Sequence, residues 1–242
     1  TLDDLVATYK SLVVSGSKDI KWFVYGAVPD AVKHLQRRWS FRRVRVVATA
    51  DEFKTSDFVI FLNAGDGLYR ESLVSVREAI HKNAATDLIY GDAAHPTGIK
   101  AEPLSFVRRP GWSPERLRGH CYVGETLVAR TEVVDRTGGI TELVVQHPHD
   151  RALRLTENAK NIVRMPELLT MAKSRDTRPS ASLDAVIKHC ARQKIDANCK
   201  LDAAVPSVRV KRNLTTQPSV AVIVPTRGTS AEVFGSKRVL VV

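Results

Sequence analysis

The sequence predicts an α/β protein in which helices flank a mostly parallel sheet. Helix-like and strand-like segments alternate over 2–90, in the order helix, strand, helix, strand, strand, helix, strand. The segment 57–62 (DFVIFL) is a near-continuous apolar run between polar residues, as a buried parallel strand is. Such sheets bind ligands beyond the carboxyl ends of their strands, which here lie at 26–28, 63–66 and 91–92.

Apolar spacing and helix-end residues place the helices. Apolar residues recur three and four positions apart over 2–15, and Gly16 is a residue type that ends helices. Pro29 and Asp30 open a second helix, because proline is tolerated in a first turn. The expected helices are 2–15, 29–38, 69–83, 131–137, 149–157 and 183–194.

Alternation and short apolar runs place the strands, and polar stretches rich in Pro and Gly place the loops. The expected strands are 20–25, 43–48, 57–62, 87–90, 122–129, 161–165 and 219–224, with 161–165 at a sheet edge. We expect a long loop over 93–120, which is rich in Pro, Gly and Arg. The polar stretches 173–182 and 211–217 are typical of linkers.

The composition is that of a basic globular protein. The chain has 242 residues, 43% of them hydrophobic, and 37 Lys and Arg against 26 Asp and Glu give a net charge of +11. This charge suits phosphate-rich partners such as nucleotide-sugars or an anionic membrane surface, or it is a basic surface without a specific role. Nucleic acid is not expected, because there is no recognised binding motif and no basic face rich in aromatic residues.

Three cysteines, Cys121, Cys190 and Cys199, fit neither a disulfide framework nor a CxxC metal pair. We therefore expect reduced thiols in a cytoplasmic protein, with contact at the inner face of the plasma membrane left open. No apolar run approaches the roughly 18 to 20 residues of a membrane span, and no signal peptide is recognisable.

Three segments carry a resemblance to a known family. DFVIFLNAGDGLYRESL (57–73) is similar to a strand-turn-helix segment, and PSVAVIVPTRG (218–228) to a first strand with its Pro-Thr turn. DLIYGDAAHP (87–96), with Trp-Ser-Pro, Tyr, Gly and Gly-Gly in order over 110–139, is the most specific match. On these residues the chain resembles family 2 glycosyltransferases of the GT-A fold, of the tandem-domain type seen in bacterial cell-surface glycan (rhamnosyltransferase-like) enzymes.

The resemblance implies three parts. Residues 1–175 would be a degenerate GT-A-like domain that lacks its first strand, and 176–217 a linker with one helix. Residues 218–242 would open a second, truncated transferase domain. Alternatively, the strand at 219–224 fills the empty slot in the first sheet, as in a circular permutation, because an unpaired apolar strand and an open sheet edge tend to associate.

The resemblance also implies an activity. Members transfer a sugar from a nucleotide donor, here a UDP- or dTDP-sugar, to a glycan or lipid-linked acceptor, commonly with Mn²⁺ or Mg²⁺ as cofactor. The donor turn, usually close to DADD, is Asn63-Ala64-Gly65-Asp66 here. Asp66, with the amide oxygen of Asn63, would hold a metal ion only weakly, or Asp66 simply caps the following helix. Tyr25 occupies the place of an aspartate that contacts the nucleotide, so it either stacks on the base or only packs.

The catalytic carboxylate of the family falls on Pro148 in the segment QHPHDRALR. His147 or His149 would substitute as the base, or both are surface residues of a loop. Asp92 is the best retained carboxylate, on the acceptor side of the resemblance. Arg108 and Arg109 would meet phosphate or remain solvated.

Two hypotheses follow for the function. The first is an enzyme of polysaccharide or cell wall biogenesis whose domain seen here is weak or inactive. The second is a non-catalytic GT-A-like module that binds an acceptor or a partner, which the losses at Tyr25, Asn63 and Pro148 favour for this segment.

Overall fold

A computed structural model of the chain describes part of its residues. The described residues are 1–15, 20–26, 33, 44–47, 56–100, 103–173, 179–223, 231–233 and 236–238. They divide into two units, Thr1–Arg212 and Asn213–Val242, each described here by itself. The helix expected at 29–38 lies outside the described residues apart from Lys33, and Gly16 lies outside them too. No described helix has the length and apolarity that a bilayer crossing requires.

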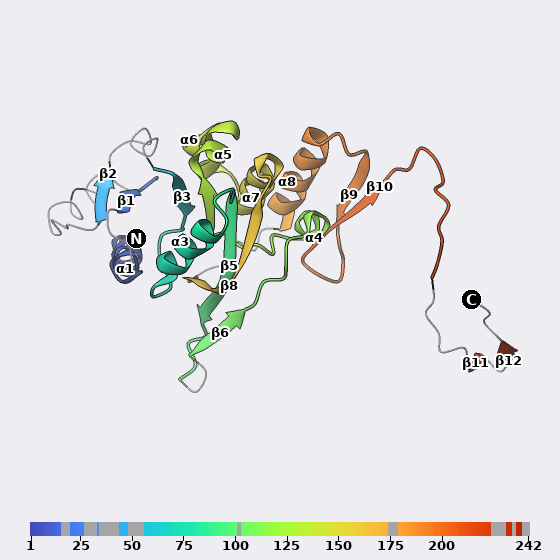
Figure 1. Ribbon diagram of the computed structural model, residues 1–242, viewed down its shortest axis with the longest axis horizontal. Helices are drawn as coiled ribbons and strands as arrows, with labels where there is room; N and C mark the ends of the chain where they lie inside the picture. Colours follow the sequence, from blue (N-terminus) through green and yellow to red (C-terminus); the bar gives the residue numbers. More distant parts are fainter. Residues whose placement is uncertain are drawn as a thin grey trace. The chain divides into compact units, whose positions relative to one another are not determined.

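A six-stranded sheet forms the centre of the first unit (Figure 1). Its strands are β3 (Phe58–Phe61), β4 (Gly67–Leu68), β5 (Leu88–Pro96), β6 (Leu104–Val107), β7 (Leu127–Arg130) and β8 (Ile162–Met171). The order is β3-β7-β5-β8-β4, and β6 pairs with β5. β5 and β8 are parallel, and β7 is antiparallel to both β3 and β5, so β3, β5 and β8 run in one direction. The expected α/β fold is confirmed, and its sheet is mixed.

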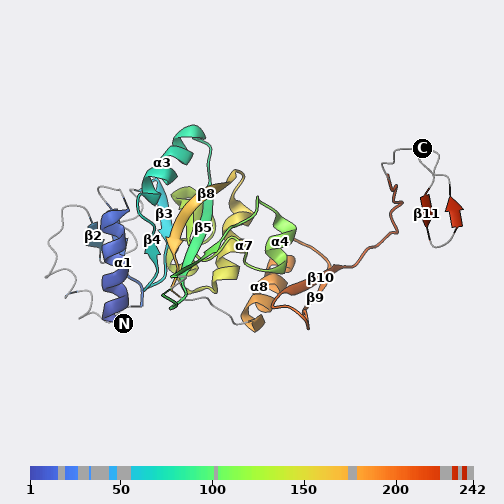
Figure 2. The ribbon, with the colours of Figure 1, turned by 90° about the horizontal axis from the view of Figure 1, so that it is seen from below.

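Helices cover both faces of this sheet, as Figure 2 shows for α3 (Ser72–Lys82) and α7 (Pro148–Asn158). Successive side chains of a strand point to opposite faces. Accordingly, Leu88 and Tyr90 pack in one apolar cluster with α7, whereas Ile89 packs in another with α3. Helices α5 (Thr131–Arg136) and α6 (Ile140–Val145) join the α7 side.

Helix α1 (Leu2–Val14) confirms the first expected helix and packs on the α3 side. Thr1 and Asp4 form a capping box at its start, in which the Asp4 amide donates to Thr1 Oγ1 at 3.2 Å. The buried Thr8 hydroxyl donates to the Asp66 carbonyl at 2.7 Å and accepts from the Gly65 amide at 2.9 Å. These bonds fasten the turn after β3 to α1.

Strands β1 (Ile20–Phe23) and β2 (Val44–Val47) form a separate parallel pair. They confirm the strands expected at 20–25 and 43–48.

The long loop expected over 93–120 is wrong. β5 continues to Pro96, a turn at Gly98 (φ +76°) reverses the chain, and β6 pairs back on β5. Helix α4 (Pro114–Gly119) follows, because Ser113 caps it by accepting from the Arg116 amide at 3.3 Å. Proline at the first position of α4 loses no helical hydrogen bond.

The edge position expected for 161–165 is also wrong, since β8 lies between β5 and β4 and extends to Met171. Pro166 lacks an amide hydrogen and cannot donate to a neighbouring strand. The pairing between β5 and β8 skips Pro166, because Gly91 pairs with Met165 but Asp92 pairs with Leu168. This bulge sits at Gly91, where an added Cβ would lie 2.8 Å from the Leu169 Cβ.

The segment 176–217, expected as a linker with one helix, contains that helix and two further strands. Helix α8 (Pro179–Arg192) is followed by a hairpin of β9 (Ala197–Leu201) and β10 (Val208–Arg212). Their buried side chains Ala185, Val186, Cys190 and Val208 belong to the same apolar cluster as the α7 side of the sheet. The first compact unit therefore ends at Arg212 rather than at 175.

In the second unit, the strand expected at 219–224 is not formed over its described part, 219–223. Val220, Val222 and Ile223 are exposed, and a strand without a hydrogen-bonded neighbour is not stable in water. The described strands of this unit are β11 (Ala231–Val233) and β12 (Ser236–Arg238), which pair as a hairpin. That 218–242 opens a second domain remains a prediction.

Candidate functional site

Two pockets lie at the carboxyl end of β3, on either side of the turn that follows it. The α1 pocket, of about 410 Å³, is lined by the start of α1, the end of β1, and β3 with its turn. The α4 pocket, of about 570 Å³, is lined by residues before and after α4, the start of α7, and the β9–β10 hairpin. Two pockets therefore lie at the edge of the sheet where the sequence predicts a ligand site.

A short bridge of side chains separates the two pockets. Asn63 lines the α1 pocket and Glu125 lines the α4 pocket, and the Asn63 amide donates to the Glu125 carboxylate. Arg151, which lines the α1 pocket, donates to the Glu125 carbonyl at 3.3 Å. A group that reached across this bridge would contact both pockets.

Two of the three donor-site residues named from the sequence, Tyr25 and Asn63, line the α1 pocket, and the third, Asp66, does not. Tyr25 is half exposed, with its ring centroid 6.4 Å from that of Phe23. An exposed ring beside a pocket leaves a face on which a nucleobase can stack. The role of Tyr25 as a stacking residue remains a prediction.

Asp66 lies on the other side of the bridge, buried in the wall of the α4 pocket. Its Oδ1 accepts from the Lys173 amide at 2.5 Å. The alternative that Asp66 caps the next helix is wrong, because α3 starts at Ser72 with Glu71 at its N-cap, and β4 intervenes.

The residues around Asp66 do not fit a tightly held divalent cation. Within the described ranges, no three His, Cys, Asp or Glu side chains gather as a metal site requires. Mn²⁺ and Mg²⁺ bind through oxygen ligands, usually carboxylates and phosphates. Here the turn after β3 supplies one carboxylate, and one of its oxygens already accepts a backbone hydrogen bond.

His149 lies at the start of α7, where Pro148 takes the first helical position and His147 the N-cap. The His149 side chain is fully buried, so the alternative of a surface residue is wrong for it. Its Nε2 donates to the Leu117 carbonyl at 2.6 Å, which leaves the Nδ1 lone pair facing inward. Burial lowers the pKa of His149 to about 4, so the ring is neutral at pH 7.

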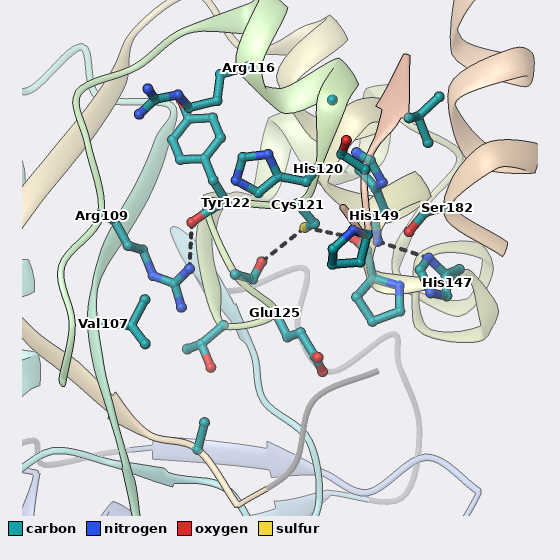
Figure 3. Close-up of a pocket in the computed structure, with 18 of the residues that line it drawn as sticks. Val107, Arg109, Arg116, His120, Cys121, Tyr122, Glu125, His147, His149 and Ser182 are labelled. Carbon is teal, nitrogen blue, oxygen red and sulfur yellow. Dashed lines mark hydrogen bonds between the residues drawn. The ribbon is translucent and has the colours of Figure 1, made fainter. Parts of the chain in front are cut away.

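Figure 3 shows the middle of the α4 pocket, with His120, Cys121 and Tyr122 between Arg109 on one side and His149 on the other. The Arg109 guanidinium donates to the carbonyls of Gly91 and Tyr122, at 2.7 and 2.5 Å. Gly124 makes room for it, because a Cβ at that position would lie 2.2 Å from the guanidinium. Arg109, one of two arginines named from the sequence, is thereby fixed at the pocket wall.

Asp92 lies apart from both pocket linings. Its buried carboxylate accepts from the Arg109 amide at 2.8 Å and from the Arg164 guanidinium at 3.2 Å. These bonds connect the segment that follows β6 to β5 and β8. The catalytic role expected of Asp92 remains a prediction, and the contacts that the structure gives it are structural.

Sequence reasoning missed the bridge residues Glu125 and Arg151. Glu125 directly follows Tyr122 and Gly124 of the most specific family segment, which is the signal that was available. Arg151 follows Asp150 in QHPHDRALR, within an expected helix. Nothing in that segment shows that its charge is buried.

Helices on both faces of a mixed sheet, with two adjoining pockets at the carboxyl end of β3, agree with the GT-A fold that the sequence predicts. The sequence matches no known protein-family model. It is 31% identical over 209 residues to the O-antigen biosynthesis protein RfbC of Myxococcus xanthus, a match that covers 76% of this chain. The chain spans only 16% of the length of that protein.

Among solved structures, residues 1–349 of TarS from S. aureus match with a TM-score of 0.53 and 14% identity, over 77% of this chain and 60% of that TarS chain. A second match is the mannosyltransferase PcManGT of Pyrobaculum calidifontis in complex with GDP-Man and Mn²⁺, with a TM-score of 0.46, 12% identity, and coverage of 80% and 62%. The TarS likeness shows that the chain has the fold of that glycosyltransferase class, and the RfbC similarity agrees with the family 2-like resemblance of the sequence.

Proposed function

We propose that this domain binds a nucleotide-sugar in the α1 pocket and a glycan in the α4 pocket, and transfers sugar weakly or not at all. The parent protein would transfer a sugar from a UDP- or dTDP-sugar to a cell-surface glycan or a lipid-linked acceptor. The similarity to an O-antigen biosynthesis protein supports a polysaccharide as the product. The domain would work in the cytoplasm, which fits the three free thiols.

The observation that carries this proposal is the bridge between the pockets. Sugar transfer requires the donor's anomeric carbon and the acceptor's hydroxyl to meet within about 3 to 3.5 Å. A donor in the α1 pocket and an acceptor in the α4 pocket meet at Asn63 and Glu125, whose side chains are hydrogen bonded. The arrangement fits a two-substrate site.

Weak transfer follows from the state of the candidate bases. A general base works best with a pKa near the working pH, whereas that of His149 is lowered to about 4 by burial. The Asp66 carboxylate already accepts a hydrogen bond from Lys173, and that of Asp92 is paired with Arg164. None of the three is free to take a hydroxyl proton efficiently.

The same observations favour a second candidate function, a non-catalytic module that presents a bound glycan or nucleotide to another domain. In that case both pockets bind their ligands, but no nucleoside diphosphate is released from the donor. Measuring that release, with the chain and a UDP- or dTDP-sugar, distinguishes the two. Release above background assigns weak catalysis, and release at background assigns a binding module.

Calorimetric titration of UDP and dTDP into the chain, with and without Mn²⁺, tests the donor pocket. We expect micromolar binding of one of them, weakened about tenfold by Tyr25→Ala, because base–aromatic stacking contributes about 1 to 3 kcal/mol. Tyr69→Ala is the matched control, since Tyr69 is similarly exposed but does not line the pocket.

Two outcomes would count against the proposal. If neither nucleotide binds with or without Mn²⁺, the α1 pocket is not a donor site. If Tyr25→Ala and Tyr69→Ala bind equally well, the nucleobase does not lie against Tyr25. Should binding require Mn²⁺, Asp66→Ala would be expected to abolish it, and the weak metal site predicted at Asp66 and Asn63 would stand.

A further inference from the structure

One buried cationic side chain, that of Arg151, has no ion-pair partner among the described residues. The Arg151 side chain is 5% exposed, and within the described part of the chain no carboxylate lies within ion-pair distance of it. Among the described residues, its guanidinium donates one hydrogen bond, to the Glu125 carbonyl, and its buried Nε has no partner. The guanidinium carbon lies 5.2 Å from the centre of the Phe61 ring.

Such a group is costly to the free protein. An arginine remains charged in proteins, and a buried charge needs a counter-charge or a full set of hydrogen bonds. Neighbouring arginines of α7 and α8 have theirs: Arg154 pairs with Asp150, and Arg192 pairs with Glu157. Arg151 differs from them because it faces the α1 pocket.

The pocket offers the rest of an anion site. Asn63 lines it with a side-chain amide, and Tyr25 contributes an exposed ring. Planar guanidinium groups bind phosphate oxygens through paired hydrogen bonds, and their charge needs no metal ion to do so. The single carboxylate of the turn after β3, by contrast, does not make a metal site.

We infer that Arg151 binds the diphosphate of a nucleoside diphosphate in the α1 pocket and supplies there the positive charge that a divalent cation would otherwise bring. The inference deepens the proposed function and rests on it for the nucleoside part of the ligand. The anion site itself is independent of that part, and inorganic pyrophosphate probes it alone.

The test is titration of UDP and inorganic pyrophosphate in EDTA, together with thermal unfolding of the unliganded chain. Arg151→Met is expected to weaken the binding of both ligands by about tenfold to a hundredfold, the effect of losing charge-assisted hydrogen bonds. Its unfolding temperature without ligand is expected to equal or exceed that of the wild type, because an unpaired buried charge is removed.

Two further variants complete the design. Arg151→Lys keeps the charge and is expected to retain more of the pyrophosphate affinity than Arg151→Met does. Arg70→Met is the matched control, because the Arg70 side chain is 81% exposed and lines neither pocket. It should bind both ligands like the wild type.

Each remaining outcome decides the matter. Wild-type affinity in Arg151→Met, or binding by the wild type only with Mn²⁺, overturns the inference and leaves the donor pocket standing. Loss of binding together with a lowered unfolding temperature assigns Arg151 a structural role and also overturns it. If pyrophosphate binds through Arg151 while UDP and dTDP do not bind, the anion site stands and the proposed function falls.

Discussion

A chain that ends at Lys173 is expected to lose the cooperative unfolding transition of a chain that ends at Arg212. The shorter chain lacks α8 and the β9–β10 hairpin, which bury Val186, Cys190 and Val208 against the α7 side of the sheet. Fully burying a side chain of this size stabilises a fold by about 1.5 to 3 kcal/mol. Three such losses approach the total of about 5 to 15 kcal/mol that stabilises a typical domain.

Removing α8 also leaves carboxylates of α7 without their ion-pair partners on α8. Glu157 and Asp150 are buried and pair with Arg192, and Glu157 also pairs with His189. Without α8 these carboxylates lose partners in a place that water reaches poorly, at least until the helix frays. The truncation therefore adds an electrostatic cost to the lost apolar contacts.

Urea unfolding followed by far- and near-ultraviolet circular dichroism measures the effect. The control is the chain that ends at Arg212, which retains the whole first unit and is expected to keep the midpoint of the full chain. Equal midpoints for the chains ending at Lys173 and Arg212 would show that α8 and its hairpin are dispensable, as a linker would be.

Replacing Glu157 with glutamine is expected to lower the free energy of unfolding at pH 7 by about 2 to 3 kcal/mol. Breaking a buried pair costs about 3 to 5 kcal/mol, and Arg192 is partly exposed, so the lower part of that range applies. The Glu157 carboxylate accepts from His189 Nδ1 at 2.6 Å and from Arg192 Nη2 at 2.7 Å.

The loss should depend on pH. Burial alone raises the pKa of Glu157, but the hydrogen bonds from His189 and Arg192 outweigh it and hold the pKa below the usual 4.5. A carboxyl whose pKa is lowered by folding stabilises the protein above its unfolded pKa, and this stabilisation is lost as the pH falls through the folded pKa. The gap between wild type and Glu157→Gln should therefore be full at pH 7 and shrink below about pH 4.5.

Urea unfolding at pH 7, 5, 4 and 3 follows this gap. Glu142→Gln is the matched control, because Glu142 is exposed and pairs with Arg154 at the surface. It should change the free energy of unfolding by less than about 1 kcal/mol at every pH. A gap for Glu157→Gln that stays constant down to pH 3 would show that its carboxylate is not held by the α7–α8 contact.

Most helices and strands of the first unit were predictable because their signals are local. The apolar spacing of 2–15 and the run at 57–62 depend only on near neighbours in the chain. Two features were not predictable in this way. The extension of β8 past Pro166 needs the bulge opposite Gly91, and the β5–β6 hairpin needs the turn at Gly98, both of which are tertiary arrangements.

The β9–β10 hairpin was missed although its pattern is present. Val208 and Val210 alternate with Arg209 and Lys211, which is the period of a strand with one solvated face. The polar residues made the segment resemble a linker. Only the packing of Val208 in the core shows that one face is buried.

The sheet edge that holds the candidate site was predictable, but the contacts between its side chains were not. Tyr25 and Asn63 were named from the family resemblance, and the rule that ligands lie beyond strand ends indicated the same edge; the structure brings them into one pocket. The pairing of Asp92 with Arg164 was not predictable, because the two residues are 72 positions apart in the chain. Arg151 escaped notice because the sequence alone does not show which face of α7 is buried or what that face lines.

The central claim is that the α1 pocket holds the diphosphate of a nucleoside diphosphate next to Arg151. A crystal structure of the chain with UDP or dTDP, grown in EDTA, tests this most directly. The account predicts the base against Tyr25 and the diphosphate within hydrogen-bonding distance of the Arg151 guanidinium, close to Asn63. A nucleotide found in the α4 pocket, or one that leaves Arg151 without a phosphate contact, would contradict it.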